Sequence, residues 1–170
     1  YNFECKKIMS ITKSTFVEKK FNELINEYNG YIWYSKFKPI NVKLSKNHRF
    51  NNMKLEIKYI NGLKYKFNLG LSLSYKIIKD AIDYYNTISN NEYLSSNKYP
   101  LHGDFSLDNL LFERNEIYII DWQYFQINNS PKGFDILNLI FEQFYYDYYS
   151  LKKLFLKNKK LFYYLISILK

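Results

Sequence analysis

The side chains best suited to chemistry lie in one stretch of the chain, residues 101–122. Here Asp104, Asn109 and Asp121 stand between apolar neighbours. A carboxamide and a carboxylate that lie close together suit a hard cation such as Mg²⁺, which takes one or two protein oxygens and keeps its other positions for waters and phosphates. Phosphoryl transfer from ATP needs, in addition, a carboxylate that orients the attacking hydroxyl. These residue types supply that minimum.

A β-hairpin can bring the three polar side chains together. Residues 110–112 and 117–120 are apolar and are separated by the polar turn 113–116, so we expect two paired strands. The hairpin would set Asn109 close to Asp121. Asp104 begins the loop that leads into it and could face the same cleft. The alternative, an ordinary hairpin whose Asp and Asn cap turns, leaves the coincidence of the polar positions unexplained.

The combined pattern resembles the catalytic segment of the protein-kinase-like superfamily. His102-x-Asp104-x-x-x-x-Asn109, followed by Ile120-Asp121-Trp122, is similar to its catalytic loop and metal-binding aspartate. The His-Gly-Asp form resembles the branch of aminoglycoside phosphotransferases and choline kinases, because protein kinases typically carry His-Arg-Asp and Asp-Phe-Gly. The segment 131–135, Pro-Lys-Gly-Phe-Asp, also resembles that branch.

The resemblance implies an α+β, protein-kinase-like fold with two lobes and a role for each matching residue. Asp104 would be the catalytic base, and Asn109 and Asp121 would hold Mg²⁺. His102 would be a scaffold residue, while Asp135 would brace the catalytic loop through backbone hydrogen bonds. The implied activity is transfer of the γ-phosphoryl group of ATP to a hydroxyl of a small molecule such as a sugar, an amino alcohol or an aminoglycoside.

Candidates for nucleotide contacts lie upstream of the catalytic segment. The resemblance implies a hinge that follows the last strand of the small lobe, and a strand lysine with a glutamate partner. The candidates are Tyr59 and Ile60 for adenine, Lys6 and Lys7 for phosphate, and Glu18 as the partner of a lysine. Each has a simpler alternative, because the two lysines could face solvent and Glu18 could belong to a helix-capping box.

The chain has no glycine-rich phosphate loop, since its five glycines are dispersed at positions 30, 62, 70, 103 and 133. Either residues before Tyr1 supply such a loop, or the protein has lost part of the small lobe that would cover the nucleotide. The second alternative is a catalytically inactive, kinase-like nucleotide-binding module. Because the sequence begins with Tyr1 and not with Met, we expect its start to be truncated or processed.

The apolar pattern predicts a strand-rich part followed by a mostly helical one. We expect a partial N-lobe over residues 1–62 and a C-lobe over residues 63–170. In the N-lobe, Phe16 would lie on the buried side of a helix that opens with the capping box. The expected elements are strands at 3–9, 31–37 and 53–60, a polar loop at 45–52, and helices at 15–28, 72–88, 134–148 and 151–169.

Composition excludes several other classes of protein. The net charge of +9 suits an anionic partner, but the lysines are scattered and the densest group, residues 152–160, has helical spacing. We therefore expect ATP and a small acceptor as partners and no nucleic acid, although a basic nucleic-acid-binding domain is the alternative. The single cysteine, Cys5, excludes a disulfide framework and fits a reducing cytoplasm. The longest apolar run, 161–169, is shorter than the roughly 20 residues of a membrane span.

The sequence does not identify the acceptor molecule. An aminoglycoside would favour an acidic pocket, and choline would favour an aromatic cage. The acidic candidates are Asp108, Glu142 and Asp147, and the aromatic ones are Trp122, Tyr124, Tyr145, Tyr146 and Tyr148.

Overall fold

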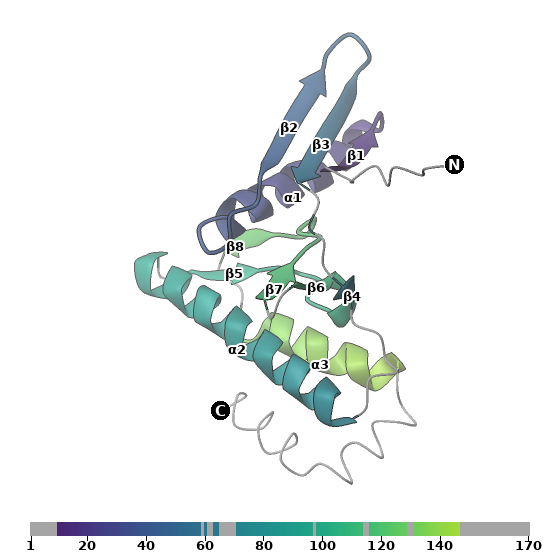
Figure 1. Ribbon diagram of the computed structural model, residues 1–170. Helices are drawn as coiled ribbons and strands as arrows, with labels where there is room; N and C mark the ends of the chain where they lie inside the picture. Colours follow the sequence, from purple (N-terminus) through teal and green to yellow (C-terminus); the bar gives the residue numbers. More distant parts are fainter. Residues whose placement is uncertain are drawn as a thin grey trace, which may run out of the picture.

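The structure is a computed structural model that describes residues 10–58, 60, 63–64, 71–96, 98–113, 116–128 and 131–146. These residues form three small β-sheets and three α-helices, so the architecture is α+β, as the sequence predicts at this coarse level. Figure 1 shows one sheet with helix α1 at one end of the molecule and helices α2 and α3 at the other.

The first sheet consists of β1 (Ser10–Thr15), β2 (Val42–Asn47) and β3 (Asn52–Lys58) in the order β1-β3-β2, with antiparallel neighbours. Met53, Leu55 and Ile57 alternate with more exposed residues and form its buried face. The predicted strand 53–60 is therefore confirmed as β3. Its partner was wrongly predicted, because β3 pairs with β1 and β2 and not with residues 31–37. The expected loop at 45–52 is a hairpin whose first strand runs to Asn47.

Helix α1 (Phe21–Tyr34), preceded by the single turn η1 (Glu18–Lys20), corrects two further predictions. The capping box does not form: Thr15 ends β1, and its Oγ1 accepts the N–H of Val17 at 3.1 Å. Residues 31–34 are helical although their aromatic side chains suggested a strand. Aromatic β-propensity reflects a half-buried environment more than a backbone preference, and a helix face supplies that environment here.

The second sheet contains the predicted catalytic hairpin. Its strands are β4 (Leu63–Lys64), β6 (Leu110–Glu113) and β7 (Glu116–Ile119) in the order β4-β6-β7. The hairpin β6–β7 is confirmed, with Leu110 opposite Ile119. The short helical turn η2 (Leu107–Asn109) leads into it. A third sheet pairs β5 (Tyr99–Leu101) with β8 (Gln126–Asn128), two strands too short to be read from periodicity.

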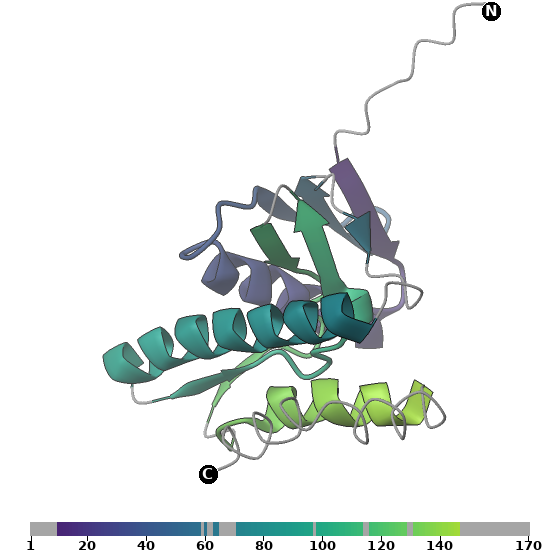
Figure 2. The ribbon, with the colours of Figure 1, turned by 60° about the horizontal axis from the view of Figure 1, so that its bottom comes forward.

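Helices α2 (Leu71–Ser96) and α3 (Phe134–Tyr146) lie on the side of the molecule away from the first sheet (Figures 1 and 2). The predicted end of α2 near residue 88 is wrong, since the helix continues through the polar run to Ser96. Ser89 and Glu92 are buried there, and Glu92 accepts the indole N–H of Trp33 at 2.8 Å. Tertiary contacts thus extend the helix beyond its local signal. None of the described helices is long and apolar enough to span a membrane.

The predicted lobe boundary near residue 62 stays a prediction. The first sheet and α1 precede it, and the other sheets and helices follow it. The predicted strand at 3–9 and the helix at 151–169 lie outside the described residues.

Trp122 lies where these parts of the structure meet. It is completely buried, and its ring lies 5.5 Å from that of Trp33, 5.2 Å from that of Tyr34 and 4.4 Å from that of His102, measured between centroids. Gly30 lets α1 approach it closely, because a Cβ atom on Gly30 would lie 2.4 Å from the Cβ atom of Trp122. Helix α1 is thereby packed directly against the segment that follows hairpin β6–β7.

We predict that Gly30→Ala destabilises the protein, although alanine is the better helix former by about 1 kcal/mol. Overpacking costs about 1 to 3 kcal/mol and here meets the backbone-proximal part of a buried tryptophan. Urea unfolding should show a net loss. Asn29→Ala, at an exposed neighbouring position of α1, is the control and should leave stability almost unchanged. Equal stability of the two variants would show that α1 does not pack on Trp122 in this way.

Candidate active site

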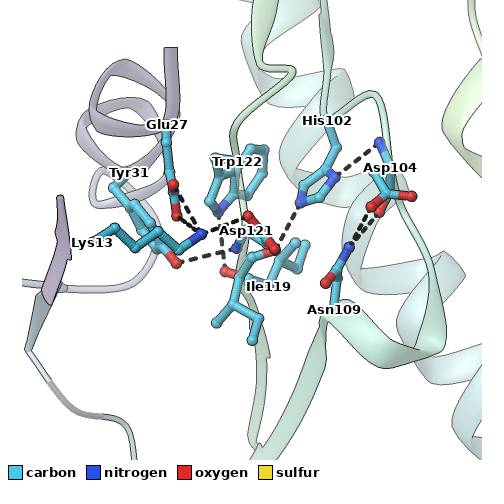
Figure 3. A network of polar contacts seen from close by, with 10 residues as sticks. Lys13, Glu27, Tyr31, His102, Asp104, Asn109, Ile119, Asp121 and Trp122 are labelled. Carbon is cyan, nitrogen blue, oxygen red and sulfur yellow. Dashed lines mark hydrogen bonds and ion pairs between the residues drawn. The ribbon is translucent and has the colours of Figure 1, made fainter. Parts of the chain in front are cut away.

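A lysine from the first sheet connects two carboxylates from other elements. The Nζ of Lys13 lies 2.7 Å from Oε1 of Glu27 and 2.8 Å from Oδ1 of Asp121 (Figure 3). Lys13 is on β1, Glu27 is on α1, and Asp121 follows β7. The Glu27 side chain is 1% exposed, whereas that of Asp121 is 35% exposed. The Glu27 carboxylate is therefore structural in character, whereas the Asp121 carboxylate is accessible to solvent.

Local sequence explains why these side chains point inward. Lys13 pairs with Leu55 in the register of β1 and β3, so it lies on the face of the sheet that covers α1. Glu27 lies three residues after Leu24 and four before Tyr31, which are both buried positions of α1. Each charge therefore occupies a position where an apolar residue is expected.

Lys13 and Glu27 were not predicted from the sequence. The predicted lysines, Lys6 and Lys7, lie outside the described residues. Glu18 is exposed and its Oε1 accepts the side-chain N–H of Asn51 at 3.0 Å, and its pairing with Lys6 or Lys7 stays a prediction. A usable signal did exist: a lysine inside the strand-like run of residues 10–15, and a glutamate at a buried-face position of a helix.

The electrostatics keep Lys13 charged. Burial lowers the pKa of its ammonium group, but the hydrogen bonds and charges of Asp121 and Glu27 outweigh this effect and raise the pKa above its usual value. Burial raises the pKa of the Glu27 carboxyl, against the opposing effect of the Lys13 contact. Lys13 is therefore a fixed cation at neutral pH, held in place from the side of α1.

Helix α1 also fixes the backbone of Asp121. Asp121 has a φ of 65°, a left-handed conformation that is uncommon for a residue other than glycine. Its N–H donates to the hydroxyl oxygen of Tyr31 at 3.1 Å. Burial raises the pKa of the Tyr31 hydroxyl, so it stays protonated. Tyr31 lies one helical turn after Glu27, and the same helix therefore positions both Lys13 and Asp121.

Asp104 and Asn109 form a second group next to the first. The side-chain Nδ2 of Asn109 donates to Oδ2 of Asp104 at 3.0 Å and to its backbone oxygen at 2.8 Å. The backbone oxygen of Asn109 accepts the N–H of Ile120 at 2.9 Å, which places Asn109 and Asp121 at neighbouring strand ends. The amide oxygen of Asn109 points away from Asp104 (Figure 3). It is thus available as an oxygen ligand.

His102 holds the loop as a neutral ring. It is fully buried, and burial lowers its pKa. Its Nδ1 accepts the N–H of Asp104 at 3.3 Å, so the proton resides on Nε2, which lies 3.0 Å from the carbonyl oxygen of Ile120. His102 thereby connects the residue before Asp121 to Asp104. Its contacts are with the backbone of Asp104 and Ile120 and with the buried ring of Trp122.

Asp135 joins the loop that contains His102 and Gly103 to the start of α3. Its two carboxylate oxygens accept the N–H groups of His102 at 2.8 Å and Gly103 at 2.9 Å, and the Tyr85 hydroxyl donates to one of them. Gly103 has a φ of 84°, and a Cβ atom there would lie 2.5 Å from the Cβ atom of Tyr124. The loop conformation before Asp104 is therefore determined by backbone contacts. The role of Asp135 in activity stays a prediction.

Asn109 and Asp121 fit a magnesium ion by their chemistry. A carboxamide and a carboxylate oxygen at neighbouring strand ends leave the remaining coordination positions to phosphates and waters. Within the described ranges, no group of three or more His, Cys, Asp or Glu side chains could hold a metal ion.

The remaining predicted site residues fall into two groups. Among the described ones, Ile60 packs against the core, Tyr124 is half exposed, and Asp108 is exposed. Trp122 is fully buried, so it cannot line an aromatic acceptor cage. The candidates whose side chains are not described are Tyr59, Glu142, Tyr145, Tyr146, Asp147 and Tyr148.

No protein-family model matches the sequence, and no curated protein matches it. Function is therefore inferred from the residues and geometry described above.

We predict that Asp135→Asn destabilises the fold by about 2 to 3 kcal/mol, the range for hydrogen bonds to a buried charged group. An amide has one oxygen, whereas His102 and Gly103 donate to two different ones. One backbone N–H would then face the amide NH₂. Urea unfolding measures the loss, and Asp108→Asn, at an exposed position of η2, is the matched control. An Asp135→Asn variant as stable as the control would contradict the bracing role.

Proposed function

We propose that this chain is the catalytic part of an ATP- and Mg²⁺-dependent phosphotransferase with a two-lobed, protein-kinase-like fold. It would act in the cytoplasm on a hydroxyl of a small molecule such as a sugar, an amino alcohol or an aminoglycoside-like compound. The observation that carries the proposal is the position of Lys13 Nζ, within 2.8 Å of both Glu27 and Asp121. A fixed cation faces a solvent-accessible carboxylate beside the Asp104 loop, an arrangement suited to the phosphates of a nucleotide.

In this proposal Lys13 binds the phosphates and Glu27 positions it. Lys13 is preferred over Lys6 and Lys7 because it has a buried carboxylate partner and reaches Asp121. Asn109 and Asp121 would hold Mg²⁺, which neutralises phosphate charge when it is bound. Asp121 would then exchange its contact with Lys13 for one with the metal. The partial exposure of its side chain, 35%, allows this exchange.

Asp104 has the position of a general base. The oxygen of the acceptor hydroxyl would attack the γ-phosphorus of ATP, while the bond from that phosphorus to the β–γ bridging oxygen breaks. The hydroxyl proton would pass to the Asp104 carboxylate, and the products are a phosphate monoester and ADP. The amide of Asn109 holds the carboxylate through Oδ2. Positioning of this kind, and not covalent chemistry, is what phosphoryl transfer needs from a protein.

The second candidate function is a catalytically inactive, kinase-like module that binds a nucleotide. Two observations favour it. The five glycines of the sequence are too dispersed for a glycine-rich phosphate loop, and the Lys13 ammonium already neutralises the Asp121 carboxylate. Both candidates share the nucleotide site, and they differ in turnover.

We predict that Asp121→Ala removes the Mg²⁺-dependent part of ATP affinity and leaves the fold intact. Lys13 keeps its ion pair with Glu27 in this variant, so no buried charge loses its partner. Calorimetric titration of ATP with and without Mg²⁺ measures the effect. Asp80→Ala, an exposed position on α2, is the control and should bind as wild type. If Asp121→Ala binds MgATP as tightly as the control does, Asp121 is not a metal ligand.

We predict that Asp104→Asn leaves MgATP affinity nearly unchanged and lowers turnover by a factor on the order of 10² to 10⁴, the usual contribution of a positioned base. The base contacts the acceptor as it attacks, whereas the nucleotide is held by other residues. The assay uses a panel of sugar, amino-alcohol and aminoglycoside acceptors, with a parallel measurement of ATP hydrolysis and with Asp80→Asn, at an exposed position of α2, as the control.

The outcomes of this assay separate the two candidates. If wild type and Asp104→Asn phosphorylate an acceptor equally fast, the assignment of the base is wrong. If wild type binds MgATP and phosphorylates nothing on the panel, the inactive module is favoured.

A further inference from the structure

The first sheet ends in a group of apolar side chains that face solvent. Phe16 is 66% exposed, Val17 46% and Phe50 61%. They come from the segment after β1 and from the turn between β2 and β3. These two segments lie together, because Thr15 pairs with Met53 and the side chain of Asn51 donates to Glu18 at 3.0 Å. The exposed apolar residues thus form one surface and not scattered positions.

Cations surround this group. We define the tip surface by its three apolar and four cationic residues: Phe16, Val17, Phe50, Lys19, Lys20, Lys46 and Arg49. Lys46 contributes from β2, where its Nζ lies 5.3 Å above the ring of Phe21, and the Arg49 guanidinium lies 5.5 Å from the ring of Phe50. All four cations are exposed, and none forms an ion pair within the described part of the chain.

Few negative charges oppose these cations. The acidic residues of the neighbouring segment 18–23 are Glu18, which accepts the Asn51 hydrogen bond, and Glu23. Four cations against two carboxylates leave a net charge of +2 on segments 16–23 and 46–50, with His48 neutral. The tip surface therefore combines an unpaired positive charge with apolar side chains whose exposure to water is unfavourable in free energy.

The shape of this region narrows the choice of partner. Figure 1 shows the β2–β3 hairpin extending from the end of the molecule opposite α3. Phe50 lies at the turn of that hairpin, so the side chain projects from a convex tip. Single-stranded nucleic acid usually lies in a groove and stacks on aromatic rings, but Val17 offers no ring. The boundary of a bilayer accepts aromatic and aliphatic side chains together with surrounding cations.

We propose that the tip surface binds anionic lipid bilayers. Phe16, Val17 and Phe50 enter the headgroup region, and the four cations contact the lipid phosphates and carboxylates. Binding requires both parts, since one set of contacts is apolar and the other is electrostatic. The contact is peripheral and reversible, and it does not depend on the phosphotransferase proposal.

The test is co-sedimentation of the full chain with vesicles of phosphatidylcholine alone and of phosphatidylcholine with about 30% phosphatidylserine, an anionic composition. Wild type should bind the anionic vesicles and not the neutral ones. Lys19→Gln with Lys20→Gln should weaken binding by about 25-fold, since each basic residue contributes about fivefold. Phe16→Ser with Phe50→Ser should also weaken binding, and to the same degree at low and high salt, because an apolar contact is not screened.

Two variants outside the tip surface are the controls. Leu94→Ser removes an apolar side chain that is 83% exposed on α2, and Lys98→Gln removes an exposed cation. Both should bind anionic vesicles as wild type does. All positions are exposed, and circular dichroism checks that each variant folds.

Four results would overturn the proposal. The first is no binding of wild type to anionic vesicles. The second is equal weakening by the tip and control variants. The third is tighter binding of a single-stranded oligonucleotide than of vesicles, with the same sensitivity to the tip variants, which would assign this surface to nucleic acid. Analytical ultracentrifugation covers one further case: a dimer abolished by Phe16→Ser with Phe50→Ser would assign the tip to self-association and would also overturn the proposal.

Discussion

The arrangement of the site depends on one buried carboxylate. Glu27 is 1% exposed on a helix face that otherwise packs apolar and aromatic side chains. A carboxylate removed from water costs several kcal/mol unless it is paired, and Lys13 supplies the pair from β1. The sheet and α1 must therefore keep one relative position. Because Lys13 also contacts Asp121, it fixes the first sheet and α1 relative to the segment that follows hairpin β6–β7.

Further contacts tie the C-terminal end of α1 to the rest of the molecule. Trp33 donates its indole N–H to the buried Glu92 of α2, and the hydroxyl of Tyr34 accepts the N–H of Ile119 at the end of β7. Lys38, just after the helix, donates to the carbonyl oxygen of Ile117 at 2.6 Å. The helix is thus held along its length by polar contacts that have few alternatives inside the core. This attachment of the helix fixes the positions of Glu27 and Tyr31.

The sequence predicted those parts of the site whose signals are local. The hairpin β6–β7 follows from two apolar runs around a polar turn, and Asp104, Asn109 and Asp121 were found as polar residues within it. Lys13 and Glu27 were missed because their partnership joins residues 14 positions apart across a sheet and a helix. The start of this helix was predicted at residue 15 because Thr15 and Glu18 have the spacing of a capping box. Thr15 instead belongs to β1, and α1 begins at Phe21. These errors all concern tertiary contacts that override local preference.

The charge balance of the site bears on what it can bind. Lys13 carries one positive charge, whereas Glu27, Asp121 and Asp104 each carry a negative one when ionised, and His102 is neutral. The group is therefore net negative, although the whole chain is +9. Free phosphates would meet repulsion from Asp104 and Asp121 that one lysine only partly offsets. On this balance we expect the proposed nucleotide site to favour a nucleotide that arrives with a divalent cation over the free polyanion. The positive charge of the chain lies elsewhere, including the tip surface, where no carboxylate of the site opposes it.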